Sequence, residues 1–210
     1  MSKTDLIKAR VHNLNPKSEI VTRPSMETAM EAVRTLIRYA GDDPMREGLL
    51  DTPSRVVRAY EEFFAGYRED AEEILGRTFE QPAQYQDVVI LRDIAYESHC
   101  EHHIMPFIGK MHIAYLPNKM VVGISKLARV VEVFAKRLQI QEKLTAEVAS
   151  AIYHHLQPKG VLVLAEGVHE CMTIRGVHKP GVNMITIQAF GVYENDAKKR
   201  EEVLGLIRGA

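Results

Sequence analysis

The apolar positions in the first part of the chain recur at helical spacing. An apolar stripe over residues 26–40 predicts a helix that starts near Ser25 and ends at Gly41. A second stripe follows shortly afterwards, with Thr52 as the expected cap and Pro53 in the first turn. A short third helix is expected over residues 69–75. The pattern therefore predicts that the chain begins with a group of helices.

The pattern changes after Pro82. Residues 183–192 alternate between apolar and polar side chains, which is typical of a half-buried strand. Two amphipathic stretches in the middle are expected to be helices, and Ser125 is the expected cap of the first. The predicted strands are residues 88–95, 110–116, 161–165 and 183–192. The two central helices carry apolar stripes over residues 127–138 and 144–152, and residues 196–207 are expected to form a last helix.

This order of elements predicts an α+β fold. Helices come first, then two strands, two helices, further strands and a last helix, which indicates an antiparallel sheet with a helix pair on one face. We divide the chain into a polar arm (1–24), a helical N-terminal subdomain (25–82) and a catalytic domain (83–210).

The composition is that of an ordinary globular protein. The chain has 210 residues, 46% hydrophobic and 26% charged, which is enough for one sizeable core. A net charge of -1 gives no reason to expect nucleic acid or an anionic membrane as a partner. The first ten residues lack the apolar stretch of a signal peptide, and the apolar run at 161–165 is too short to span a bilayer. Two cysteines without an export signal fit a reducing cytosol, so we expect a cytoplasmic protein.

The two cysteines and their histidine neighbours predict a metal site. Cys100 and His103 stand three apart, and Cys171, the only other cysteine, also has a histidine close by in sequence. Two thiolates and an imidazole make a three-ligand zinc set whose fourth position is left for water, as in catalytic zinc sites. The alternatives are a Cys100–Cys171 disulfide, or a buried thiol beside ordinary surface histidines. The crowding of three histidines around Cys100 favours zinc.

Two further histidines would lie beside this zinc set. His102 and His169 titrate near neutral pH and could act as acid and base. The alternative is that they only orient the metal ligands. The remaining histidines are interpreted as surface or packing residues: His99, His112, His154, His155 and His178.

A basic set could bind phosphate. Lys126 and Arg129 share a face of the helix expected to begin at Ser125, where free backbone N–H groups favour an anion. The other members are Arg55 and Arg58, on the second helix, and Arg175, shortly after Cys171. The alternative is a solvated basic face. There is no glycine-rich phosphate loop, so a bound nucleotide would be held by side-chain cations.

Gln141 and Glu142 stand between the two central helices. A carboxylate can accept two hydrogen bonds from the N–H edge of a guanine, whereas an exposed glutamate at a helix start is also favoured by the helix dipole. Chemistry alone leaves both interpretations open.

Several of these motifs occur together, in one order, from about Met26 to the C-terminus. In this combination the chain resembles GTP cyclohydrolase I of the zinc-dependent type. The motifs that carry the resemblance are Asp51-Thr52-Pro53 with Arg55-Val56, Cys100-Glu101-His102-His103, Gly109-Lys110, Ala114-Tyr115-Leu116-Pro117, Gly123-Ile124-Ser125-Lys126-Leu127 with Arg129, Arg137-Leu138-Gln139 with Gln141-Glu142, and His169 with Cys171 and Arg175-Gly176.

The resemblance implies a T-fold subunit in a toroidal homodecamer, with active sites built from adjoining subunits. It implies that GTP and water give formate and 7,8-dihydroneopterin triphosphate, the first step toward tetrahydrofolate or other pterins. By position, the implied residues are the zinc ligands Cys100, His103 and Cys171, the catalytic histidines His102 and His169, the purine-recognition pair Gln141 and Glu142, and the triphosphate set Ser125, Lys126, Arg129, Arg175, Arg55 and Arg58.

Two departures leave other hypotheses open. His99 beside the zinc block and the basic run 177–180 differ from the pattern that we expect. They leave open an altered substrate preference, or a paralogue that makes a related pterin or deazapurine precursor. A second hypothesis is a related enzyme that stops at a formylated, ring-opened product or accepts another purine nucleotide. A zinc-stabilised nucleotide-binding oligomer without activity is a third hypothesis. The joint presence of His102 and His169 favours catalysis.

Overall fold

The computed structural model describes residues 21–76, 78–80 and 85–209. These residues form two compact units, one ending at Phe64 and the other beginning at Ala65. Residues 1–20 of the predicted arm, and the predicted domain boundary after residue 82, lie outside the described residues. Among the described residues, no helix combines the length and the apolar character needed to cross a bilayer.

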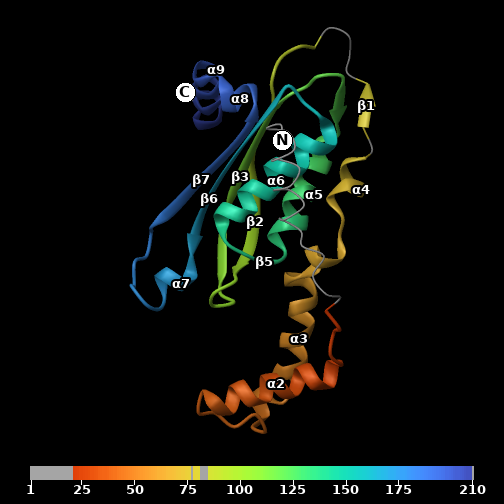
Figure 1. Cartoon of the computed structure of the whole chain (residues 1–210). Coiled ribbons are helices and arrows are strands. Elements are labelled where there is room, and N and C mark those ends of the chain that lie inside the picture. Colours follow the sequence, from red (N-terminus) through yellow and green to blue (C-terminus); the bar gives the residue numbers. More distant parts are fainter. Residues whose placement is uncertain (1–20, 77, 81–84, 210) are drawn as a thin grey trace, which may run out of the picture. The chain divides into compact units, whose positions relative to one another are not determined.

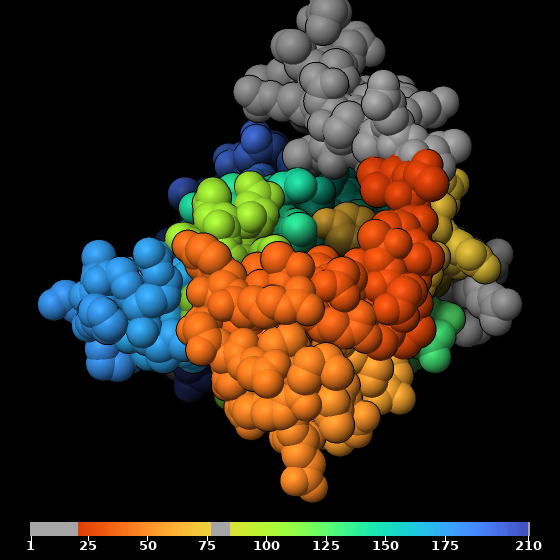
Figure 2. Space-filling model, turned by 90° about the horizontal axis from the view of Figure 1, so that it is seen from below, coloured from red at the N-terminus to blue at the C-terminus, as the bar shows by residue number. Residues whose placement is uncertain are grey.

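The first unit contains two of the predicted helices. α2 (Met26–Tyr39) begins as expected, because the Ser25 hydroxyl accepts a hydrogen bond from the backbone N–H of Thr28 at 3.1 Å. A 3-10 turn (Glu47–Leu49) and α3 (Thr52–Phe63) follow. Figure 2 shows the surface of α2 and of the segment after it in red and orange.

The predicted cap of α3 is wrong by one residue. Asp51 stands before the helix with helical backbone angles, so Thr52 is already the first helical residue. The Ser54 hydroxyl donates to the Asp51 carbonyl at 2.9 Å instead of a side chain capping the free N–H groups. Pro53 lies in the first turn, as predicted.

A five-stranded sheet is the centre of the second unit, and Figure 1 shows its long strands side by side. Its strand order is β5-β2-β3-β6-β7. The bounds are β2 (Val89–Cys100), β3 (Pro106–Leu116), β5 (Leu138–Gln139), β6 (Gly160–His169) and β7 (Asn183–Gly191). The four long strands are antiparallel, while β5 pairs with β2 in parallel, so the sheet is mixed rather than wholly antiparallel. A second, small sheet pairs β1 (Thr78–Glu80) with β4 (Met120–Val122).

Helices cover both faces of this sheet. The predicted helix pair is α5 (Ile124–Ala135) and α6 (Gln141–Leu156), which packs on one face together with α4 (Ala71–Leu75). On the other face, α8 (Val192–Asn195) and α9 (Ala197–Arg208) cover one end. A 3-10 turn (Ala65–Arg68) precedes α4, and α7 (Glu170–Thr173) follows β6. The α+β class is therefore confirmed.

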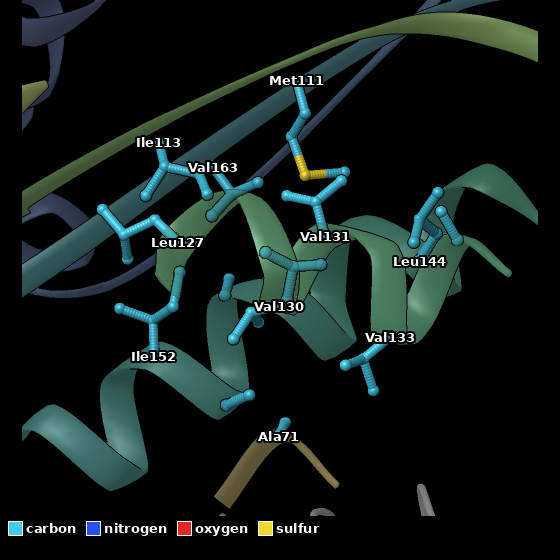
Figure 3. Close-up of a cluster of buried hydrophobic side chains, with 14 of the residues drawn as sticks. Ala71, Met111, Ile113, Leu127, Val130, Val131, Val133, Leu144, Ile152 and Val163 are labelled. Atoms are coloured by element: carbon cyan, nitrogen blue, oxygen red, sulfur yellow. The ribbon is translucent and has the colours of Figure 1, made fainter. Parts of the chain in front are cut away.

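Alternation along the strands assigns side chains to the two faces. Met111 and Ile113 of β3 point toward Leu127 and Val131 of α5, as Figure 3 shows, and all four are 0% exposed. Ala114 belongs to the opposite cluster, under α8 and α9. Burial of the larger apolar side chains stabilises the fold by about 1.5–3 kcal/mol each.

The predicted cap of α5 is also wrong. Gly123, in an extended conformation, precedes the helix, which begins at Ile124 without a capping side chain. Ser125 is consequently the second residue of the helix. The residue is exposed.

A bulge in β2 changes which face its side chains occupy. Between Leu91 and Ile94 the pairing with β3 shifts by one residue, and Asp93 has a positive φ of 57°. Before the bulge, Leu91 packs on the face covered by α5 and α6, and after it Ile94 and Cys100 do so. The backbone N–H of Asp93 donates to Nδ1 of the buried His112 at 3.2 Å, which holds the bulge.

We predict that Gly109→Ala destabilises the protein. Gly109 lies opposite Gly167 in the β3–β6 pair, and an added methyl group would overlap the backbone carbonyl of Glu166. We expect a loss of about 1–3 kcal/mol in the free energy of unfolding. The matched control is Gly205→Ala in α9, where no atom lies within 4 Å of the new methyl group. The control should be neutral or stabilising, by up to about 1 kcal/mol. Urea denaturation followed by circular dichroism measures both, and equal midpoints would contradict the expected overlap.

Candidate active site

The sheet topology brings the two cysteines to one edge. β2 and β6 both pair antiparallel with β3, so they run in the same direction and end at the same edge of the sheet. Cys100 is the last residue of β2, and Cys171 lies in α7, directly after β6. Residues far apart in the sequence therefore meet through the single strand between them.

Cys100, His103 and Cys171 form a compact group of potential metal ligands. One ligand atom from each lies within 4.8 Å of the others. The turn after β2 achieves this, because the N–H groups of His103 and Ile104 both fold back onto the Cys100 carbonyl, at 3.3 and 2.8 Å. Both cysteines are free thiols, so the alternative of a disulfide is not what the structure contains. The predicted grouping is observed.

The charges around this group suit a cation. Burial and the neighbouring Cys100 raise the pKa of the Cys171 thiol, because two adjacent thiolates in a partly buried site repel each other. A divalent cation between the sulfurs would reverse this effect, since it stabilises both thiolates. Two sulfurs and one imidazole nitrogen are a donor set that zinc accepts. The residues therefore fit a zinc ion.

His102 also lies at the metal group. Its Nδ1 is 3.6 Å from Cys100 Sγ, and its ring centroid is 6.2 Å from that of His103. The side chain is exposed. An imidazole in this position is accessible to a ligand bound at the predicted zinc site.

His169 is held in a more enclosed environment. Its ring stacks on Phe107, with centroids 4.5 Å apart and planes inclined by 2°. Its Nε2 lies 3.0 Å from Oε1 of Gln141. Burial lowers the pKa of His169, and the negative charge of Glu142 opposes this effect. The ring is therefore fixed in place, two residues before the Cys171 thiol.

The prediction that Gln141 and Glu142 stand between two helices is wrong. Both residues belong to the first turn of α6. Successive helical residues point in different directions, and these two separate accordingly. Gln141 is 0% exposed, whereas Glu142 is exposed near His169. Only Glu142 presents its side chain to solvent.

Arg175 is the one predicted phosphate-binding residue that the second unit places at the metal group. Its Nη1 lies 3.1 Å from Nε2 of His103. The loop that follows is exposed and forms the light-blue lobe in Figure 2. A guanidinium thus borders the group of ligands, where it could meet an anion.

The first turn of α5 is distant from this group within one chain. Val122, two residues before the helix, donates its N–H to the Tyr115 hydroxyl, near the far end of β3. Phe107, beside His169, lies eight residues earlier on the same strand. At about 3.3 Å per residue, Phe107 and Tyr115 lie roughly 26 Å apart along the strand. The exposed or half-buried residues at this end are Ser125, Lys126 and Arg129.

Arg55 and Arg58 belong to α3 in the first unit, which is described separately. Both are exposed, and Arg55 forms an ion pair with Asp51 at 3.1 Å. Exposed pairs of this kind contribute little to stability. The Arg55 guanidinium therefore stays accessible to solvent despite its ion pair.

Sequence reasoning missed the support around His169. Phe107 was not identified because its position opposite His169 depends on the β3–β6 register, which apolar alternation alone does not specify. The glycines at 109 and 167 were a usable signal, since paired glycines indicate a close approach of backbone or side chains.

We predict that Cys171→Ala reduces bound zinc by roughly tenfold or more, because a ligand set loses one of its two thiolates. Met172→Ala is the matched control, since Met172 lies in the same short helix and is 38% exposed. Elemental analysis by mass spectrometry after gel filtration gives the zinc content per chain. Unchanged zinc content in Cys171→Ala would remove this thiol from the ligand set.

Comparison with known proteins identifies the family. The family model described as GTP cyclohydrolase I matches residues 29–208. A GTP cyclohydrolase 1 from Hyphomonas neptunium is 58% identical over 191 residues, 91% of this chain and 93% of the relative. A GTP cyclohydrolase 1 from Maricaulis maris is 54% identical over the same shares of both chains.

Among solved structures, the apo form of an archaeosine synthase, QueF-Like, is 18% identical with a TM-score of 0.44. It covers 51% of this chain and 97% of its own. The assignment rests on the sequence relatives and the family match, which extend over most of the chain. The chain belongs to the GTP cyclohydrolase I family.

Proposed function

We propose that the protein hydrolyses the imidazole ring of GTP, releases formate and forms 7,8-dihydroneopterin triphosphate. One observation carries this proposal, namely the group of Cys100, His103 and Cys171 with two further histidines beside it. Membership of the GTP cyclohydrolase I family indicates that the substrate is GTP. Cys100, His103 and Cys171 would hold a zinc ion, which would supply Lewis acidity for the activation of water near neutral pH.

His102 and His169 would move the protons. The carbon between the two nitrogens of the guanine imidazole ring becomes a good electrophile once nitrogen 7 is protonated, so an acid is needed there. The later opening and rearrangement of the ribose needs an acid and a base near its ring oxygen. His102 is exposed at the metal group and His169 is enclosed, so two imidazoles of different environment serve these steps.

Glu142 would bind the purine. Its exposed carboxylate lies near His169 and can accept hydrogen bonds from the N–H edge of guanine. Gln141 is buried, so Glu142 is the member of the pair that can reach a ligand.

The triphosphate would be held by cations from more than one subunit. Arg175 lies at the metal group, but α5 begins near Tyr115, which lies roughly 26 Å along β3 from Phe107 in the same chain. A triphosphate cannot bridge both within one chain and still place its purine at the zinc ligands. We therefore infer a homo-oligomer in which Ser125, Lys126 and Arg129 of one subunit complete the site of another. Arg55 and Arg58 belong to the same proposed set.

The finer expectations follow from the resemblance. They are a T-fold subunit, a toroidal homodecamer and a cytoplasmic location. The sheet with its helix pair and the two free cysteines support the first and the last of these.

The first test is zinc-dependent turnover. Purified protein is incubated with GTP as prepared, after chelation, and after zinc is added back. We expect the formation of formate and of the pterin, detected by its fluorescence after oxidation, to stop on chelation and to resume with zinc. The proposed reaction needs water that the metal activates. Formate without pterin would indicate a reaction that stops early. Zinc-loaded protein that binds GTP but gives neither product would contradict the proposal and favour a nucleotide-binding protein.

The second test is complementation between subunits. We expect His169→Ala and the double variant Lys126→Ala, Arg129→Ala each to lose most of their activity, by roughly 10²–10⁴-fold for the histidine. Co-assembled in equal amounts, they should recover about a quarter of wild-type activity, because random assembly leaves that share of sites with both halves intact.

The control pair for complementation is His102→Ala with His169→Ala. Both substitutions damage the same half of the site, so this mixture should stay inactive. Recovery in the control pair, or none in the test pair, would contradict a site shared in this way.

A further inference from the structure

The side-chain amide of Gln141 is buried, and both its nitrogen and its oxygen form hydrogen bonds within the protein. The residue begins α6 and is 0% exposed. Its Nε2 donates to the carbonyl oxygens of Ala165 and Met184, at 3.1 and 2.9 Å, and lies 3.2 Å from Oγ1 of Thr186. An amide nitrogen has only two hydrogens, so these three oxygens saturate it.

These contacts determine which way the amide points. A flipped amide would set Oε1 against the carbonyl oxygens of Ala165 and Met184. Neither Oε1 nor a carbonyl oxygen can donate a hydrogen bond, so the flipped arrangement is unfavourable. Oε1 must therefore point away from the carbonyl groups of Ala165 and Met184. Buried polar groups that are fully satisfied in this way are rigid.

The fixed oxygen points at His169. Oε1 lies 3.0 Å from Nε2 of His169, and a carbonyl oxygen only accepts, so Nε2 must carry the hydrogen. In the neutral ring this leaves the free electron pair on Nδ1. Gln141 thus selects one of the two tautomers of His169.

Other residues hold the ring without selecting its tautomer. Phe107 stacks on the His169 ring at 4.5 Å and itself meets Tyr96 edge to face at 6.0 Å. A methyl group on Gly167 would come within 3.0 Å of Oε1 of Gln141, so the glycine leaves space for the amide. Stacking determines the plane of the ring, and Gln141 determines its rotation within that plane.

We propose that Gln141 is a positioning residue that presents Nδ1 of His169 to the substrate, and that it is not a purine contact. This inference rests on the proposed function, because it assumes that His169 takes part in the reaction. Glu142 then remains as the purine-binding member of the pair. The side chain of Gln141 acts through His169 alone.

The kinetic test uses Gln141→Met, which has a similar length and no acceptor for Nε2. We expect kcat to fall by about 10–100-fold, the usual effect of removing the partner that orients an active-site histidine, with KM for GTP nearly unchanged. Glu142→Gln is the matched comparison and should raise KM, since it weakens a contact with the purine. An unchanged kcat in Gln141→Met, or a raised KM as its main effect, would overturn the inference.

A spectroscopic test does not depend on whether this variant folds. Zinc-loaded wild-type protein with ¹⁵N-labelled histidine is studied at about pH 8.5, where imidazole is neutral. Long-range ¹H–¹⁵N spectra distinguish the two tautomers, and His169→Ala assigns the signal among nine histidines. We expect His169 to be the Nε2–H tautomer, and a mixture in Gln141→Met. The Nδ1–H tautomer in the wild type would overturn the inference.

The same preparations separate this inference from the proposed function. Zinc-loaded wild-type protein that releases neither formate nor pterin from GTP contradicts the function itself. Active wild-type protein whose kcat does not respond to Gln141→Met contradicts only the role of Gln141.

Discussion

The pairing of β3 with a strand on each side is the constraint on which the site depends. β2 and β6 are both antiparallel to β3, so both end at one edge, and Cys100 and Cys171 meet there. No local sequence signal places these two thiols together. Their approach depends on backbone hydrogen bonds along the whole of β3, and a slip of one residue would turn every side chain of the slipped strand to the other face.

Much of the architecture could be predicted from local patterns. The helix after Ser25 was found from its apolar stripe, and the α5 stripe from Leu127 and Val131, because burial on one face imposes a period that the sequence shows. The caps at Thr52 and Ser125 were wrong because the start of a helix depends on the backbone angles of the residue before it, and side-chain type only biases those angles. β5, with two residues, is too short to show any period.

The residue types of the candidate metal site could be predicted from the sequence, but the residues that position His169 could not. Residue type and spacing were enough to group Cys100 with His103, since few other roles explain that combination. Gln141 and Glu142 look alike in the sequence, and their different fates depend on the carbonyl groups of β6 and β7, which come from later in the chain. The distance between α5 and the metal group is likewise a property of the folded sheet alone.

The bulge at Asp93 determines which face of the sheet Cys100 occupies, and this restricts the length of β2 after the bulge. From Ile94 to Cys100, every second residue faces α5 and α6. The thiol therefore faces the site only if any change in the length of this stretch is an even number of residues. Loss or gain of one residue there would move Cys100 to the opposite face of the sheet. A change of two would restore the face but displace the thiol along the strand by about 6.6 Å. This half of the strand can therefore change in evolution by substitution, whereas insertions and deletions would separate the two thiols.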